Sequence, residues 1–409
     1  MTYVIINCFL YIIALVFYLK RYKTLDSYAV ILAAFTFTAI MCACYFYTVS
    51  KTYQNITMFP FIYMFVCLLI FLSPFKGMQV KGTLEIVETR PIRILVWIYI
   101  ISGLLAIYYT IPTAKELIQS GEWGMLRAQV YSDDENVVLY QSALERMAKN
   151  IHSYLRPLGV VMCFYYLTVP KRNKLKLFLI WFSYIGESFL ASTLIASRGM
   201  IIMVVFNVLL SFVIFKEYIS HRVKKIVAII ALLLTIPLTL YMSVVSVSRF
   251  GADDAGSSVF MYLGHSMLTF NKGVMGTMHD FAYGKFAFLY FIDLFGGNLS
   301  GKMDALMQSL GYTGGTGFYT FIGTFYIDWG PIGAFIVAIL MAVFLGHFTK
   351  KRHKKLSDLI LIVYFAGFYM NGVFVIGYSY ALGIIMCFVV YFIVKFVESR
   401  STISLKLHN

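Results

Sequence analysis

Long apolar runs recur along this chain, and short stretches with basic residues separate them. The runs are roughly 17 to 22 residues long, which is enough for a helix to cross a hydrocarbon core of about 30 Å. Hydrophobic residues make up 60% of the chain and charged residues only 13%, which is too apolar for a water-soluble domain of this length. The pattern predicts an all-α, polytopic integral membrane protein with a single transmembrane domain over residues 1–409.

About eleven of these runs have the length and composition of a transmembrane helix. The first run has no basic residues before it and no small-residue cleavage pattern after it, so we expect a span there and not a cleaved signal peptide. The expected spans are 2–19, 27–48, 56–75, 92–111, 155–169, 177–195, 200–215, 226–247, 331–348, 357–375 and 379–396.

The basic residues are concentrated in every second loop between the expected spans. By the positive-inside rule the face that carries them is cytoplasmic, which puts the N-terminus outside and the C-terminus in the cytoplasm. The net charge of +15 is therefore accounted for by short loops, and nucleic acid is not an expected partner. The clusters begin at Lys20, Lys76, Lys171, Lys216, Lys350 and Lys395.

Neither a metal nor a cofactor is expected. The 6 cysteines lie inside apolar runs, without the spacing of metal ligands or disulfides, and are typical of small buried side chains. No HExxH motif, no cluster of Cys and His and no DxD pair occurs in the expected outer loops.

Two long segments are expected on the outer side, at about 112–153 and 248–330. Loops of this length are usually functional or disordered, and both segments hold too many apolar and aromatic residues to be disordered, so we expect a cap over an outward-facing cavity. Two short apolar pieces, 259–270 and 286–295, are interpreted as interfacial or partly re-entrant helices. A break is expected near Gly330, because the aromatic run and the following span together exceed the length of one crossing.

Arginines at the ends of the expected outer hairpins are candidates for binding an anion. Arg198, in a tight turn between two spans, and Arg249, just after another span, stay charged at the edge of the hydrocarbon and together could grip a diphosphate through forked hydrogen bonds. The alternatives are a snorkelling Arg198 that meets lipid phosphate and an Arg249 that pairs with a nearby aspartate. Arg127 and Arg156 are further candidates for substrate binding.

Three other ionisable residues are candidates. His265 is expected to act as a general base, since imidazole is the usual base near neutral pH, and His279 is a candidate for substrate binding. A hydrogen-bonded structural role is the alternative for both histidines. Glu187 falls in the middle of a span, where a carboxylate needs a partner or a wet cavity, so it is also a candidate for substrate binding. A protonated glutamate that bonds to a neighbouring helix is the alternative.

An aromatic, glycine-containing run occupies residues 316–330. It includes Tyr326 and Asp328, which we interpret as part of a wall that contacts sugar rings. A membrane aromatic belt is the alternative interpretation of the same run.

Taken together, these features resemble the bacterial O-antigen or oligosaccharide repeat-unit polymerases, the Wzy-type family. The resemblance rests on many spans with few charges, a large outer loop late in the chain, the Ser197-Arg198-Gly199 turn and the aromatic run into Asp328. It implies a GT-C-like polymerase or ligase architecture in the bacterial inner membrane. A clear pair of RxxxG motifs, as described for some members, is missing, so the roles of single arginines stay open.

The resemblance implies a metal-independent glycosyltransferase that uses no cofactor. It would transfer a growing glycan from undecaprenyl diphosphate to the non-reducing end of a new lipid-linked repeat unit at the outer face. Arg198 and Arg249 would stabilise the departing diphosphate, and His265 would be the base. The implied partners are the lipid-linked oligosaccharide, membrane lipid, a chain-length regulator protein and a flippase.

Three other functions are kept as alternatives. An O-antigen ligase transfers finished glycan to a lipid core with a similar arrangement. A flippase or polysaccharide exporter is expected to show internal repeats and charges spread over several spans, whereas Glu187 is essentially the one mid-span charge in this sequence. A membrane-bound acyltransferase would place its histidine inside a span, whereas His347 lies at a cytoplasmic span end.

Overall fold

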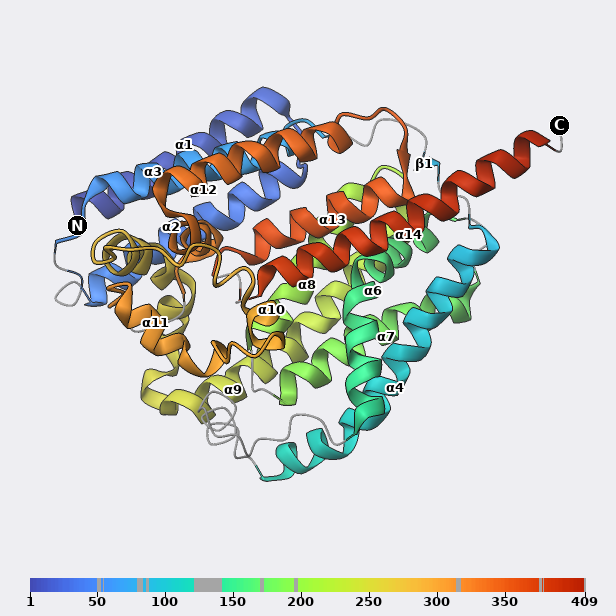
Figure 1. Cartoon of the computed structure of the whole chain (residues 1–409), viewed down its shortest axis with the longest axis horizontal. Helices are drawn as coiled ribbons and strands as arrows, with labels where there is room; N and C mark the ends of the chain where they lie inside the picture. Colours follow the sequence, from blue (N-terminus) through green and yellow to red (C-terminus); the bar gives the residue numbers. More distant parts are fainter. Residues whose placement is uncertain are drawn as a thin grey trace. The chain divides into compact units, whose positions relative to one another are not determined.

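The computed structural model describes residues 1–49, 53, 55–78, 84–85, 88–120, 142–169, 173–194, 198–313, 318–374, 377 and 379–407. Nearly all of the described chain is helical, and a short parallel pairing joins β1 (Leu84–Glu85) to β2 (Lys354–Lys355) (Figure 1). Among the described residues, 7 helices are long and apolar enough to cross a membrane, and Gly199–Phe215 and Leu356–Asn371 are shorter apolar helices. The prediction of an α-helical protein with several membrane-spanning helices is therefore confirmed.

The chain divides into two compact units. Unit 1 comprises Met1–Gln79, Gly256–Lys351 and Phe365–Ile385, and unit 2 comprises Val80–Ala255, Arg352–Tyr364 and Met386–Asn409. In unit 1 lie α1 (Thr2–Tyr22), α2 (Ser27–Val49), α3 (Met58–Leu72), η1 (Ser73–Phe75), η2 (Phe270–Val274), α10 (Leu289–Leu294), η3 (Ser300–Lys302), α11 (Met303–Ser309) and α12 (Thr320–Thr349). In unit 2 lie α4 (Arg90–Ser120), α6 (Ala143–Thr168), α7 (Lys174–Leu194) and α8 (Arg198–Phe215). The helices α9 (His221–Thr269), α13 (Leu356–Asn371) and α14 (Tyr380–Leu407) contribute residues to both units.

Each expected span lies largely within one observed helix, because a backbone surrounded by hydrocarbon must satisfy its hydrogen bonds internally. The helices and the spans differ mainly at their ends. Helix α4 continues to Ser120 and α6 begins at Ala143, so helical turns occupy both ends of the expected outer loop 112–153. Polar residues limit a membrane span, but they do not by themselves end a helix.

Helix α9 runs for 49 residues and passes through Arg249 without a break. Residues 259–269 are therefore the last part of α9, which leads into the π-helix η2. The interfacial or partly re-entrant position expected for 259–270 stays a prediction. The charged stretch after Arg249 contains no proline that would stop the backbone from continuing as a helix. The second apolar piece, 286–295, contains the 6-residue α10, which is too short to cross a membrane.

The expected break near Gly330 is confirmed. Gly330 has φ 69° and ψ −178°, a conformation that residues with a side chain avoid, and a proline follows it inside α12. The half of α12 before the break is buried, and its Phe321 and Phe325 rings pack against Phe71 with centroid distances of 4.9 and 5.7 Å. The break therefore separates a buried half-helix from the longer apolar half that follows it.

Replacing Gly330 with alanine is expected to lower the free energy of unfolding by about 2 kcal/mol. The new Cβ would lie 2.9 Å from the Phe281 ring, in a backbone conformation that is strained for alanine. Thermal unfolding of the purified protein in detergent measures the loss. Gly346→Ala is the matched control on the same helix, where an added Cβ meets nothing within 4 Å and helix propensity favours alanine. An equal loss in both variants would contradict the strain assigned to Gly330.

Candidate functional site

An ion pair joins two helices of unit 2. Nη2 of Arg156 on α6 donates to Oε2 of Glu187 on α7 over 2.8 Å, and the two side chains are 28% and 8% exposed. A carboxylate in the middle of an apolar helix needs such a partner. Both residues are substrate-binding candidates from the sequence, and the structure brings them together across 31 positions of the chain.

His152 lies one helical turn before Arg156 and is fully buried. Its Nδ1 is 3.1 Å from the carbonyl oxygen of Tyr99, and its ring stacks on the Tyr99 ring with 4.3 Å between centroids. A neutral ring that donates from Nδ1 keeps a lone pair on Nε2. This Nε2 is 3.9 Å from Oε2 of Glu187, too far for a hydrogen bond, and has no hydrogen-bond partner within the described part of the chain. It is therefore an unpaired acceptor beside the ion pair.

Two glycines bring α4 and α6 close enough to form this cluster. A Cβ added to Gly159 on α6 would lie 2.2 Å from Cζ of Tyr99, and one added to Gly103 on α4 would lie 2.6 Å from Cε1 of His152. Close backbone approach at small residues is typical of helices that pack in membranes. Helix α4 consequently packs against α6 and α7, and Figure 1 shows the three as neighbouring ribbons.

Further polar atoms of this cluster are buried and lack a hydrogen-bond partner among the residues that the structure describes. They are Nε of Arg156 and the hydroxyl of Tyr99. Buried polar groups are ordinarily hydrogen-bonded, so an unpaired one indicates a place for water or a ligand. The cluster thus has donors for an anionic oxygen and, in His152, an acceptor for a proton.

His265, the general base expected from the sequence, lies near the end of α9 in unit 1 and is 4% exposed. Its Nε2 is hydrogen-bonded to the hydroxyl of Tyr53, and its Nδ1 lies 3.1 Å from Oγ1 of Thr269. The rings of Tyr45 and Tyr53 both meet its ring edge-on with 5.6 Å between centroids. Both ring nitrogens are therefore engaged within unit 1, which is the arrangement of a structural histidine, and the catalytic role stays a prediction.

Three candidate arginines fall partly or wholly outside the described chain. Arg198 is the first residue of α8 and Arg249 lies within α9, both in unit 2, but the structure describes only their backbone. Arg127 lies outside the described residues altogether. The expected roles of these arginines in binding a diphosphate therefore stay predictions.

Asp328 is fully buried and holds three parts of unit 1 together. Its carboxylate accepts hydrogen bonds from the backbone N–H of Phe286 at 3.0 Å and of Ala287 at 2.9 Å. The hydroxyl of Tyr380 donates a third hydrogen bond at 2.7 Å. In this structure Asp328 stabilises the fold and offers no exposed surface to a sugar.

Tyr326 and His279 are the two remaining candidates in unit 1. Tyr326 is 9% exposed, and its ring contacts those of Phe270 and Phe281 with 5.8 Å between centroids in each case. His279 is exposed, and its backbone N–H donates to the carbonyl oxygen of Leu310 at 3.1 Å. Tyr326 is therefore a core residue in this structure, whereas His279 is accessible to a ligand.

Sequence reasoning missed His152 and Tyr99. A signal for His152 was present, because it precedes Arg156 by four residues and so lies on the same helix face. Tyr99 carries no such signal, since a tyrosine in an apolar run is ordinary. Its part in the cluster follows only from the packing of α4 against α6.

Comparisons with protein-family models, with curated proteins and with solved structures found no match. The case for a function therefore rests on the residues of the chain itself.

Proposed function

We propose that this protein polymerises undecaprenyl-diphosphate-linked oligosaccharide repeat units in the bacterial cytoplasmic membrane. The observation that carries the proposal is the Arg156–Glu187 pair, a guanidinium held among apolar helices with unpaired polar atoms beside it. Glycosyl transfer from a lipid diphosphate releases an anionic leaving group, and fixed guanidinium groups are well suited to stabilise it. The resemblance to the repeat-unit polymerases supports the same activity.

In the proposed reaction a hydroxyl group at the non-reducing end of the acceptor repeat unit attacks the anomeric carbon of the growing glycan. A new C–O bond forms there, the bond to the diphosphate breaks with its electron pair on the leaving oxygen, and the hydroxyl proton passes to a base. Arg156 joins Arg198 and Arg249 as the proposed cations for the diphosphate. His265 is the base that the sequence predicts, and His152 is the base that the cluster in unit 2 adds. Neither a metal nor a cofactor takes part in this step.

The proposed reaction takes place at the outer face of the membrane. In this orientation the N-terminus is outside and the C-terminus is cytoplasmic. The cap expected from segments 112–153 and 248–330 stays a prediction, since residues 121–141 and 314–317 lie outside the described chain. The basic clusters of the sequence support this orientation through the positive-inside rule. A flippase would deliver the repeat units, and a chain-length regulator protein would limit the polymer.

Reconstitution tests the proposed activity. Purified protein in liposomes is supplied with undecaprenyl-diphosphate-linked repeat units, and the length of the glycan is followed on a gel. We expect a ladder of polymers without any added lipid core. Glycan transfer that occurs only onto an added lipid core would indicate a ligase, and movement of repeat units between leaflets without lengthening would indicate a flippase. Either outcome would overturn the proposal.

Alanine in place of Arg198, Arg249 or His265 is expected to leave membrane insertion intact and to abolish long polymer, so that cells display glycan of a single repeat. The length of surface glycan in a complemented deletion strain measures the effect. Arg222→Ala and His347→Ala are the controls, since both side chains are exposed and lie at the expected cytoplasmic face. Full-length polymer in all three site variants would overturn the roles assigned to these residues.

A further inference from the structure

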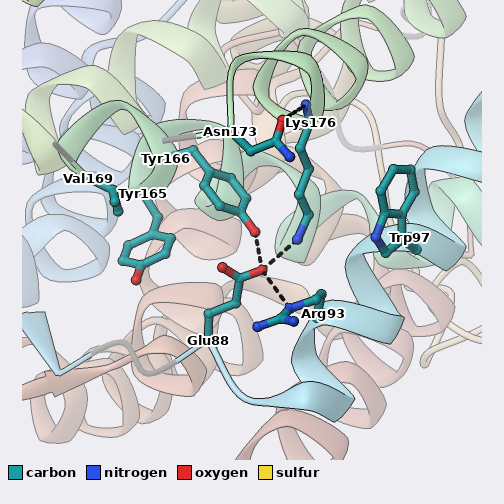
Figure 2. Close-up of a pocket in the computed structure, with 8 residues that line it drawn as sticks. All are labelled: Glu88, Arg93, Trp97, Tyr165, Tyr166, Val169, Asn173 and Lys176. Atoms are coloured by element: carbon teal, nitrogen blue, oxygen red, sulfur yellow. Dashed lines mark hydrogen bonds and ion pairs between the residues drawn. The ribbon is translucent and has the colours of Figure 1, made fainter. Parts of the chain in front are cut away.

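A cavity of about 310 Å³ lies in unit 2, where the first turns of α4 and α7 meet the last turn of α6. Figure 2 shows that the side chains of Tyr166, Lys176 and Arg93 point toward the carboxylate of Glu88. The volume is at the lower end of the range for small-molecule sites. The cavity shares no residue with the Arg156–Glu187 cluster.

Three side chains lie close to one carboxylate oxygen of Glu88. Its Oε1 accepts a hydrogen bond from Nζ of Lys176 at 2.5 Å and another from the hydroxyl of Tyr166 at 2.5 Å, and it lies 3.7 Å from Nε of Arg93. Burial raises the pKa of Glu88, but these hydrogen bonds and the charges of Lys176 and Arg93 lower it more, so the pKa lies below its usual value. Glu88 is therefore ionised at neutral pH, and it fixes the position of Lys176.

The two cations of the cavity differ in how they are held. The Lys176 side chain is 7% exposed and lies over the Tyr166 ring at 5.0 Å from its centroid. The Arg93 side chain is 58% exposed, and its distance of 3.7 Å from Glu88 is too long for a hydrogen bond. Within the described chain, no acceptor takes a hydrogen bond from the Arg93 guanidinium. With two cations facing one carboxylate, the cavity keeps one excess positive charge and a guanidinium ready to bind an anion.

The surroundings of the cavity suit a lipid. Arg93 and Trp97 lie in the first two turns of α4 and Lys176 in the first turn of α7, and both helices are long and apolar enough to cross a membrane. Basic and aromatic side chains at the ends of spans are typical of the level of lipid headgroups. Trp97 is 39% exposed, and Trp97 and Val169 both add apolar surface to the lining of the cavity, which a soluble anion would not need.

We propose that this cavity binds the phosphate group of an anionic phospholipid. The Arg93 guanidinium donates to the phosphate oxygens, Lys176 adds a second positive charge, and Trp97 packs against the glycerol backbone. The negative charge of Glu88 repels the phosphate, which weakens binding and keeps the lipid exchangeable. The proposal does not depend on the polymerase activity.

Nanodiscs of phosphatidylcholine with or without phosphatidylglycerol test the proposal, with native mass spectrometry of the purified protein to identify retained lipid. The wild-type protein is expected to retain phosphatidylglycerol in preference to phosphatidylcholine. Arg93→Gln is expected to weaken this preference about tenfold, as the loss of one charge-assisted contact does. Arg90→Gln removes the same charge from an exposed side chain of the same helix turn that does not line the cavity, and is expected to leave the preference unchanged.

Two further measurements identify the ligand. Inorganic phosphate is expected to leave the unfolding temperature of the protein in phosphatidylcholine nanodiscs unchanged. If phosphate raised this temperature as much as phosphatidylglycerol does, the cavity would be a site for free phosphate, and the lipid assignment would be overturned. Glu88→Gln is expected to bind phosphatidylglycerol more tightly than the wild type, because the repelling charge is gone. Equal losses in Arg93→Gln and Arg90→Gln, or weaker lipid binding by Glu88→Gln, would also overturn the proposal.

Discussion

Replacing Glu187 with glutamine is expected to lower the free energy of unfolding by about 3 kcal/mol. The change removes the counter-ion of Arg156, whose guanidinium cannot give up its proton, and leaves a positive charge among apolar helices. The loss lies at the lower end of the range for buried pairs because 28% of the Arg156 side chain is exposed. Equilibrium unfolding of the purified protein in detergent measures it. Glu217→Gln, the same change at an exposed carboxylate of unit 2, is the control, and an equal loss there would contradict the prediction.

Substitutions of Arg156 distinguish its contribution to stability from its contribution to polymer synthesis. Arg156→Lys keeps the positive charge beside Glu187 but loses the planar fork, so we expect stability to change little and polymer synthesis to fall about 100-fold. The exchanged pair, Arg156→Glu with Glu187→Arg, restores opposite charges on the two helices and is expected to recover stability without activity. Recovery of full polymer synthesis in the exchanged pair would assign the arginine to folding alone.

Replacing Asp328 with alanine is expected to lower the free energy of unfolding by at least about 3 kcal/mol, since each buried donor left without an acceptor costs about 1–3 kcal/mol. The variant leaves two backbone N–H groups, those of Phe286 and Ala287, and the hydroxyl of Tyr380 without their shared acceptor. Because these groups come from separate segments of unit 1, the loss loosens several contacts at once. Thermal unfolding in detergent again provides the measurement.

An exposed aspartate of the same unit provides the control for Asp328. Among the described residues, Asp280 accepts hydrogen bonds only from two residues close to it in sequence, through the N–H of Phe281 and the hydroxyl of Tyr283. Asp280→Ala is therefore expected to leave the unfolding temperature unchanged. If Asp328→Ala unfolds at the wild-type temperature but makes no polymer, the sugar-contacting role expected from the sequence would be favoured over the structural one.

The membrane helices were predictable because their signal is local. A continuous apolar run predicts a helix, and the Gly330–Pro331 sequence predicts a break in that helix. Both features therefore follow from residues that are neighbours in the chain. The course of α9 was not predictable by the same reasoning. Charges after Arg249 indicate the end of a span, whereas the end of a helix depends on backbone hydrogen bonds that continue to Thr269.

The candidate site was predictable only residue by residue. Arg156 and Glu187 stand out as charges next to or within apolar runs, but their pairing depends on how α6 and α7 are turned toward each other. The same holds for Glu88, whose partners Tyr166 and Lys176 lie 78 and 88 positions later in the chain. Contacts at such separations leave no trace in the local pattern of a single sequence.

The contacts of Gly159 with Tyr99 and of Gly103 with His152 fix the rotation of α6, the helix that carries Arg156. Each ring fills the space where the opposite helix has no Cβ, so α6 fits against α4 in one rotational setting. A shift by one residue would turn α6 by about 100° and push both rings into occupied space. Arg156 lies between His152 and Gly159 on that helix, so the fit also determines the side of α6 from which its side chain extends. The hydrogen bond to Glu187 then holds the guanidinium on that side.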